Sequence, residues 1–130
     1  ALDFYIKALA AKELYRMPKP DGGLFHAEFM IGNSLLYISD EAPDWHAVAM
    51  PEGTTASCLF AINTEDCEQS FADAIAAGAT ALKQPKDEFW GARSAMVKDP
   101  FGYRWNFSQK TEEVSPEEME KRAKEAMNQA

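Results

Sequence analysis

The sequence has few cysteines, few basic residues and no long apolar run, and each absence narrows the possible functions. Its 130 residues include two cysteines, Cys58 and Cys67, which form no CxxC motif and no disulfide framework. We therefore expect two buried thiols in a reducing cytoplasm. No apolar stretch approaches the roughly 20 residues of a membrane-spanning helix. No charged and apolar leader opens the sequence, so nothing in it indicates export.

The charge balance is acidic. The chain has 13 Lys and Arg against 21 Asp and Glu, which gives a formal net charge of −8. An acidic surface repels phosphate backbones and anionic headgroups, and no basic stripe with interleaved aromatic residues is present. Both features argue against nucleic-acid and membrane partners. The composition, 46% hydrophobic and 12% aromatic, is that of one ordinary soluble domain.

The first third of the chain predicts a helix followed by strands. An apolar stripe at helical spacing opens it, formed by Leu2, Tyr5, Ile6 and Leu9. An apolar-rich run at 14–17 and a turn signal at 18–23 follow. Residues 24–31 then alternate, with Phe25, Ala27, Phe29 and Ile31 on one face and His26, Glu28 and Met30 on the other. Gly32 and Asn33 favour a tight turn, so residues 34–39 are the expected hairpin partner.

The remainder predicts a linker, a second mixed segment and a final helix. Residues 40–54 are expected to be the linker, and 56–63 a strand. A helix capped by Asn63 or Thr64 follows and ends at Gly78, with an apolar stripe of Cys67, Phe71, Ala74 and Ile75. We expect strands at 79–84, 93–98 and 103–108, a loop at 85–91 and a turn at 99–102. Ser115, Pro116 and Glu118 form a capping signal for the last helix, whose thin apolar stripe suggests a contact with another surface, such as a second subunit.

The two halves share the order helix, strand, strand, turn, strand. Aligning Phe4 with Phe71 brings His26 onto Arg93 and, with two extra residues in the second turn, residues 34–40 onto 103–109. Identity between the halves is slight, and only the second half has a strand before its helix. We interpret the chain as an internal repeat on the basis of element order and turn positions.

Several short motifs occur in an order typical of a known family. They are Phe4-Tyr5, Arg16-Met17-Pro18, Asp21-Gly22, His26-Ala27-Glu28, Ile31-Gly32-Asn33-Ser34 and Asp40-Glu41, then Ala76-Ala77-Gly78-Ala79, Phe89-Trp90-Gly91-x-Arg93, Asp99-Pro100-Phe101-Gly102, Trp105 and Ser115-Pro116-Glu117-Glu118. In this ordered set the sequence resembles the PhnB-like branch of the vicinal oxygen chelate superfamily. That superfamily contains glyoxalase I, bleomycin resistance proteins and extradiol dioxygenases.

The resemblance implies an α+β fold in which two βαβββ modules form curved mixed sheets around a cavity, usually in a homodimer. We accordingly expect one domain, with module 1 at about residues 1–41, the linker at about 42–54, module 2 at about 55–110 and a C-terminal helix at about 115–129. The family has a strand before its first helix, whereas this sequence opens inside that helix. The first strand of module 1 is therefore expected to be missing, which leaves residues 34–39 as a sheet edge.

Metal-dependent members of the superfamily take His, Gln or Glu ligands from the first and last strands of each module. The resemblance places three of the four ligand positions at Tyr37, Leu59 and Asn106, and the fourth in the missing strand. Leucine cannot ligate, and tyrosine and asparagine are poor replacements for imidazole and carboxylate in a divalent site. We therefore expect the usual metal site to be lacking and no resident cofactor, although a divalent metal at another position stays possible.

Two histidines and one carboxylate are further candidates. His26 and Glu28 share the polar face of residues 24–31, from which they can look into the cavity. The pair can act as a general base or hold a displaced metal, or it can be a hydrogen-bonded pair that only fixes the sheet. His46, next to Trp45 in the linker, is expected to be exposed.

The segment from Phe89 to Arg93 is the other candidate. Phe89 and Trp90 can form an aromatic wall, and Arg93 can clamp an anionic or carbonyl-bearing ligand. The alternative is a loop anchored by its aromatics, with Arg93 paired to an acidic residue. Tyr37 and Asn106, at two of the implied ligand positions, are expected to touch whatever fills the cavity.

Three functions remain open. The first is a cytoplasmic, homodimeric protein that binds a small molecule, in the sequestering style of bleomycin resistance, between Trp90, Arg93, Tyr37, Asn106 and the His26/Glu28 pair. The second is a lyase, isomerase or dioxygenase that uses His26 and Glu28 with a metal or by acid–base chemistry alone. The third is a scaffold dimer with a vestigial cavity, in which the C-terminal helix makes the contact. The sequence does not decide whether the protein is an enzyme.

Overall fold

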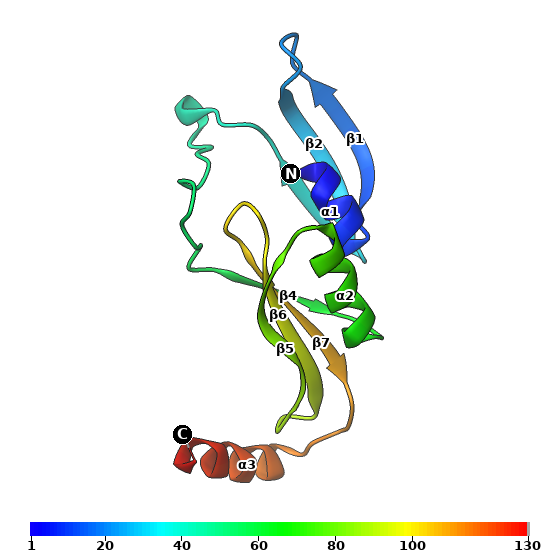
Figure 1. The fold of residues 1–130 in the computed structure, drawn as a ribbon, viewed down its shortest axis with the longest axis vertical. Coiled ribbons are helices and arrows are strands. Elements are labelled where there is room, and N and C mark those ends of the chain that lie inside the picture. Colours follow the sequence, from blue (N-terminus) through cyan, green and yellow to red (C-terminus); the bar gives the residue numbers. More distant parts are fainter. Residues whose placement is uncertain (130) are drawn as a thin grey trace.

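Two β-sheets, one from each half of the chain, lie one beyond the other along the molecule, as Figure 1 shows for the computed structural model. The structure describes residues 1–129. The first half consists of α1 (Leu2–Leu9), β1 (Lys12–Pro18), β2 (Leu24–Ile31) and β3 (Ser34–Ile38). Its three strands form an antiparallel sheet in the order β1-β2-β3.

The second half consists of β4 (Leu59–Asn63), α2 (Cys67–Ala77), β5 (Thr80–Glu88), β6 (Ala92–Lys98) and β7 (Arg104–Lys110). Its sheet has the order β4-β7-β6-β5, with β4 parallel to β7 and the other pairs antiparallel. This is a βαβββ arrangement. The first half repeats it without a strand before α1 in the part of the chain that the structure describes. The α+β class inferred from the sequence is confirmed.

The core lies between the sheets and the helices α1 and α2, which pack against each other. The alternation expected in β2 is confirmed, because Ala27, Phe29 and Ile31 are buried. The ring of Tyr5 in α1 stacks on Phe29 with a centroid distance of 6.0 Å. At the start of the strand, however, Phe25 is 51% exposed and contacts the ring of Trp45 instead of the core.

The two helical stripes differ in part from the expected ones. In α1 the buried set is Leu2, Tyr5, Ala8 and Leu9, so Ile6 turns outward. In α2 the N-cap is Asp66, whose carboxylate accepts a hydrogen bond from the amide of Gln69 at 3.1 Å. Thr64, one of the two predicted caps, instead forms a hydrogen bond between its hydroxyl and the hydroxyl of Ser70 at 2.7 Å. Helix α2 still ends at Gly78 with a φ of 117°, where a residue without a Cβ is unstrained.

The strand β5 runs through the segment predicted to be a loop at 85–91. Its pairing with β6 skips from Lys83 to Lys86, so Pro85 sits in an irregular stretch where no ladder hydrogen bond needs its missing N–H. The loop is therefore confined to the short connection between β5 and β6, which carries Phe89, Trp90 and Gly91.

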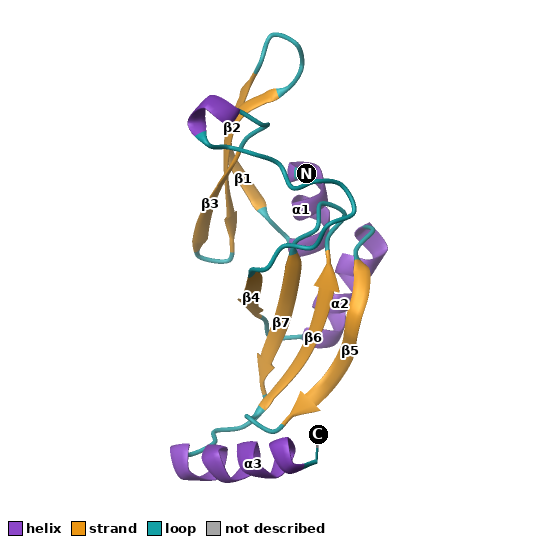
Figure 2. Cartoon of the chain, turned by 90° about the vertical axis from the view of Figure 1, so that its left-hand side faces the viewer, coloured by secondary structure: helices purple, strands orange, loops and turns teal. Residues whose placement is uncertain are grey.

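The linker and the C-terminal helix complete the chain. The linker contains one short 3₁₀ turn, η1 (Pro43–Trp45), and His46 after it is exposed as predicted. The helix α3 (Pro116–Asn128) lies below the second sheet in Figure 2. It begins as the capping signal predicted, with the Ser115 hydroxyl accepting from the amide of Glu118 at 3.2 Å. None of the described helices is long and apolar enough to cross a membrane.

The two cysteines are in different environments. Cys67 is fully buried at the start of α2, where desolvation raises the pKa of its thiol. Cys58 is exposed, so the expectation that both thiols are buried is wrong. Cys58 lies in the connection before β4, which begins at Leu59, and the first residues of β4 are themselves exposed, so this edge of the sheet buries no thiol.

Candidate ligand-binding site

Each sheet has one face packed on a helix and one face turned away from it, which we call the helix-free face. On β2 and β3 the ladder pairs Glu28 with Tyr37 and leaves His26 on the same side. The buried residues Ala27 and Phe29 point to the opposite side, toward α1. The structure therefore brings together three of the candidate residues, His26, Glu28 and Tyr37, on the helix-free face of the first sheet.

These three side chains form a small polar and aromatic group. The imidazole Nε2 of His26 lies 3.4 Å from Oε1 of Glu28, and the His26 ring meets the Tyr37 ring edge-on with a centroid distance of 5.0 Å. Both members of the pair remain about one-third exposed, at 32% and 31%, and Tyr37 is 65% exposed. They are accessible to a small molecule, and the pair has the donor and acceptor groups that acid–base chemistry needs.

Asn106 lies on the helix-free face of the second sheet. The register places it between Met96 on β6 and Ala61 on β4, while its sequence neighbours Trp105 and Phe107 are buried toward α2. Leu59 is on the same face as Asn106, two residues earlier along the β4 ladder. The hydrocarbon side chain at this position offers no donor to a metal.

Phe89 and Trp90 lie at the far end of the second sheet. Their rings pack edge-to-face at 5.0 Å, and Trp90 is 39% exposed. A pocket of about 570 Å³ opens beside Trp90, between the ends of β4, β6 and β7 and the segment before α3. Trp90 thus lines a cavity at the end of the helix-free face, whereas Phe89 is not among the residues that line it.

Arg93 is not on this face. The ladder pairs it with Gln109 and Asp87, on the side that carries the buried Ala95 and Val97. Its guanidinium donates to Glu68 of α2 at 2.7 Å and to Asp87 at 3.1 Å, and these hydrogen bonds raise the pKa of Arg93. The structure therefore places Arg93 in an ion-pair network between α2 and β5, away from Tyr37 and Asn106. The expected clamp does not form here.

A second polar group on the helix-free face was not found from the sequence. Glu88 and Lys83, both on β5, form an ion pair, and Oε1 of Glu88 also accepts from the hydroxyl of Ser94 at 3.0 Å. The side chain of Glu88 is only 7% exposed, and the Lys83 ammonium lies 5.9 Å from the centre of the Trp90 ring. The sequence did not indicate this group because β5 pairs irregularly with β6, so the side chains of β5 do not simply alternate between the two faces of the sheet.

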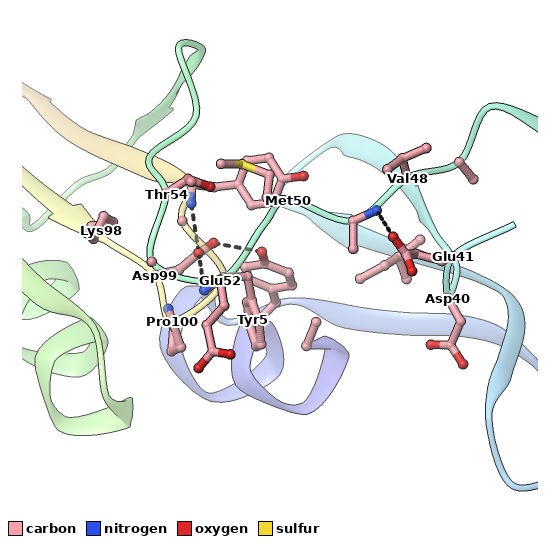
Figure 3. Close-up of a pocket in the computed structure, with 18 of the residues that line it drawn as sticks. Tyr5, Asp40, Glu41, Val48, Met50, Glu52, Thr54, Lys98, Asp99 and Pro100 are labelled. Atoms are coloured by element: carbon pink, nitrogen blue, oxygen red, sulfur yellow. Dashed lines mark hydrogen bonds between the residues drawn. The ribbon is translucent and has the colours of Figure 1, made fainter. Parts of the chain in front are cut away.

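A separate pocket of about 590 Å³ lies between the linker, the start of α1 and the turn from β6 to β7 (Figure 3). None of the candidate ligand-binding or catalytic residues predicted from the sequence lines this pocket. Its floor is Asp99, which is 2% exposed and accepts from the Tyr5 hydroxyl at 2.7 Å and the indole of Trp105 at 2.9 Å. The amides of Phe101 and Tyr103 donate to its other oxygen.

Asp99 is therefore a saturated buried carboxylate that joins α1 to the second sheet. Burial and the hydrogen bond to Asp99 raise the pKa of Tyr5 well above its ordinary value near 10, so the phenol stays protonated as a donor. With four donors satisfied, Asp99 has a structural role. A third pocket, of about 710 Å³, lies between the end of α1, β3 and β4 and is lined by both apolar and polar side chains.

Within residues 1–129, no three His, Cys, Asp or Glu side chains come together in a way that would hold a metal ion. The implied ligand positions Tyr37, Leu59 and Asn106 supply a phenol, a hydrocarbon and an amide. This donor set does not fit the His, Gln and Glu set of the metal-dependent members.

The family model of the Glyoxalase/Bleomycin resistance protein/Dioxygenase superfamily matches residues 1–107, and the chain belongs to this superfamily. An uncharacterized protein of Mycobacterium bovis is 34% identical over 123 residues, covering 92% of this chain and 81% of the relative. An uncharacterized Arabidopsis thaliana protein is 30% identical over 128 residues, covering 92% and 76%.

Solved structures share the fold at lower identity. TioX from Micromonospora sp. ML1 superposes with a TM-score of 0.66 at 23% identity, covering 84% of this chain and 86% of its own. TnmS3 from Streptomyces sp. CB03234, described as an antibiotic binding protein, superposes with a TM-score of 0.59 at 22% identity, covering 84% and 83%. At these identities the likeness establishes the fold alone.

Proposed function

We propose that this protein, as a PhnB-like member of its superfamily, binds a small organic molecule on the helix-free faces of its two sheets and does so without the usual metal ligand set. One observation carries the proposal. Tyr37, His26 and Glu28 stand together on a face where they support no core, and Tyr37 leaves 65% of its surface exposed. Ligand sites are concave and combine aromatic rings with a few fixed polar groups, and this face supplies both kinds of side chain.

Residues on the helix-free face of the second sheet also suit a ligand. Asn106 and Trp90 add an amide and an indole on the second sheet, and Leu59 replaces a ligating side chain by an apolar one. The fold neighbour TnmS3 is described as antibiotic binding, which supports a binding function for this architecture. Binding without chemistry needs shape and polar contacts only.

We further propose that two copies enclose the ligand as a cytoplasmic homodimer. The helix-free face of the first sheet exposes the large side chains Tyr15, Met17 and Leu35 beside Tyr37, and a contiguous apolar patch of this kind favours association. The free thiols of Cys58 and Cys67 suit a reducing compartment.

The test is a thermal melting screen of small aromatic and heterocyclic compounds. A ligand at about a hundredfold excess over its Kd stabilises the folded state by about 2.7 kcal/mol. We expect the melting shift of any active compound to be lost in Tyr37→Ala and in Asn106→Ala. It should persist in Trp45→Ala, which removes an even more exposed aromatic ring from the linker. If no compound raises the melting temperature, or if the shifts survive both site variants, the proposal is wrong.

An enzymatic function is the second candidate, and the His26–Glu28 pair at 3.4 Å is the observation that favours it. The pair can serve as a base or as part of a displaced metal site. After treatment with a chelator, the protein would be melted with Mn²⁺, Fe²⁺, Co²⁺, Ni²⁺ and Zn²⁺ in turn. A rise with one metal that disappears in His26→Ala would favour this candidate, whereas an unchanged melting temperature with every metal would count against its metal-dependent form.

A further inference from the structure

The helix-free face of the second sheet is basic, although the chain as a whole carries a net charge of −8. The strands β5, β6 and β7 place five basic side chains and a single carboxylate, Glu88, on this face. The basic residues are Lys83, Lys86, Lys98, Arg104 and Lys110. Lys83 pairs with Glu88, and Lys110 pairs with Glu113 from the following segment. Charge of one sign is therefore concentrated on one face of an acidic protein.

Lys98 and Arg104 lie at the end of this surface that borders the turn between β6 and β7. They lie directly opposite each other on neighbouring strands, an arrangement in which like charges repel. Their cross-strand neighbours are Thr80 next to Lys98 and Leu59 next to Arg104, and neither neighbour is acidic. In the part of the chain that the structure describes, no carboxylate lies within ion-pair distance of either residue.

Arg104 has an additional unmet requirement. Its Nη2 donates to the carbonyl of Ser57 at 3.1 Å, but its Nε is buried and has no hydrogen-bond partner. Among the described residues it is the buried side-chain donor left unsatisfied. A guanidinium presents its outer N–H groups in a fork that matches a carboxylate or phosphate, so an anion beside Arg104 and Lys98 would relieve the repulsion between the two cations.

The position of the pair connects it to the proposed ligand site. Asn106 is two residues beyond Arg104 on β7, on the same face and next to Met96. Lys98 also reaches the margin of the pocket under the linker, where Figure 3 shows it at the edge of the group. An acidic group held between Lys98 and Arg104 would leave the rest of a ligand against Asn106.

Resting on the proposed function, we infer that the ligand is a small organic anion whose carboxylate or phosphate is held by Lys98 and Arg104. Leu59 and Met96, which lie on the same face as Arg104 and Asn106, suit an apolar body for the same molecule. Arg93, which the sequence favoured as the anion clamp, is already neutralised by Glu68 and Asp87.

The inference is tested with three probes that share one ring system and differ in charge: naphthoate, naphthamide and naphthylmethylammonium. Binding to the full chain is followed by NMR amide shifts. We expect naphthoate to bind about tenfold more tightly than naphthamide, which corresponds to about 1.4 kcal/mol. Added salt should weaken naphthoate alone, because its extra affinity is Coulombic. The cationic probe should bind most weakly.

Variants locate the effect. Lys98→Gln and Arg104→Gln should each weaken naphthoate about tenfold, the size expected for losing a charge-assisted contact, and leave naphthamide unchanged. Lys124→Gln removes the same charge from α3 and should change neither. Circular dichroism checks folding, and if Arg104→Gln does not fold, Lys98→Gln alone decides. Equal binding of all three probes, no binding of naphthoate, or full naphthoate affinity in Lys98→Gln would overturn the inference.

The two proposals fail in different ways. If neutral or cationic compounds from the melting screen bind and depend on Tyr37, the proposed function stands and the anionic class is wrong. If no compound of any charge raises the melting temperature, the proposed function itself is wrong.

Discussion

Asp99 holds the two halves of the molecule together through hydrogen bonds. It accepts from Tyr5 on α1 and from Trp105 on β7 while remaining 2% exposed. The carboxylate is the acceptor for four buried or half-buried donors. Each donor that loses this acceptor would cost about 1–3 kcal/mol of stability. Asp99 therefore links the turn between β6 and β7 to the position of α1 against the second sheet.

Replacing this carboxylate should be severe. We expect Asp99→Ala to lower the free energy of unfolding by at least about 3 kcal/mol, since it leaves the Tyr5 hydroxyl, the Trp105 indole and two amides without an acceptor. Urea unfolding followed by circular dichroism measures the change. Asp44→Ala, at an exposed position in η1, should stay within about 0.5 kcal/mol of the wild type. A similar small effect for Asp99→Ala would contradict the assigned role.

The raised pKa of Tyr5 predicts a pH dependence. Below pH 10 the phenol is neutral in both states, so its stabilising contribution is complete. Above pH 10 the unfolded chain loses this proton and the folded chain keeps it, so stability falls by about 1.4 kcal/mol per pH unit. Unfolding of wild type and Tyr5→Phe compared at pH 8 and above pH 10 should show the wild-type advantage shrinking. A constant difference would rule out the buried phenol as its source.

At the scale of elements, α3 is attached through one arginine. Arg122 donates to the carbonyl of Phe89 at 3.0 Å and to the carboxylates of Glu112 and Glu118 at 2.6 and 3.0 Å. No residue of the described part of α3 is fully buried, and its apolar residues Met119, Ala123 and Ala126 are only half-buried, so we expect polar contacts to carry more of its attachment than apolar packing. The helix is thus fixed to the β5–β6 connection by polar contacts, next to Trp90.

Removing that arginine should release the helix. We expect Arg122→Gln to increase amide hydrogen exchange across Pro116–Asn128 with a change in melting temperature of no more than about 2 °C, because the core does not depend on α3. Lys121→Gln, the adjacent exposed position, should leave exchange as in the wild type. Equal protection in both variants would show that other contacts hold α3.

The elements that the sequence predicted well are those specified by local chemistry. The alternation of β2, the turn at Gly32 and the capping signal at Ser115 depend on near neighbours only, and all three are present. The cap of α2 was misplaced because Asn63, Thr64 and Asp66 all have capping side chains, and the choice is made by the bond from Thr64 to Ser70.

The sequence predicts only part of the site, because strand alternation can be read from a sequence but the pairing register between strands cannot. His26, Glu28 and Tyr37 were brought together by strand alternation, which the sequence displays. Arg93 does not join them. It points to the same side of β6 as the buried Ala95 and Val97, and this alternation in the sequence indicates the helix-packed face. The Lys83–Glu88 pair and the pocket above Asp99 depend on the irregular pairing of β5 and on the path of the linker, which no local pattern encodes.

At the scale of the whole molecule, the helix-free face of the first sheet exposes Tyr15, Leu35 and Tyr37, which is the basis of the dimer proposal. Light scattering at micromolar concentration should give twice the mass of one chain. Leu35→Glu places a charge on the exposed apolar patch and should shift the protein toward the monomer. Ile75→Glu, on the exposed side of α2, should keep the mass of the wild type. A monomeric wild type would contradict the homodimer.

The most direct measurement of the central claim is NMR mapping of the amides that shift when the strongest compound from the melting screen is added. A ligand held on the helix-free faces predicts shifts centred on Tyr37 and His26 in the first sheet and on Asn106 in the second. Amides of Val48 and Met50, which line the pocket under the linker, should change little. Shifts confined to those linker residues, with β2, β3 and β7 unaffected, would contradict the account.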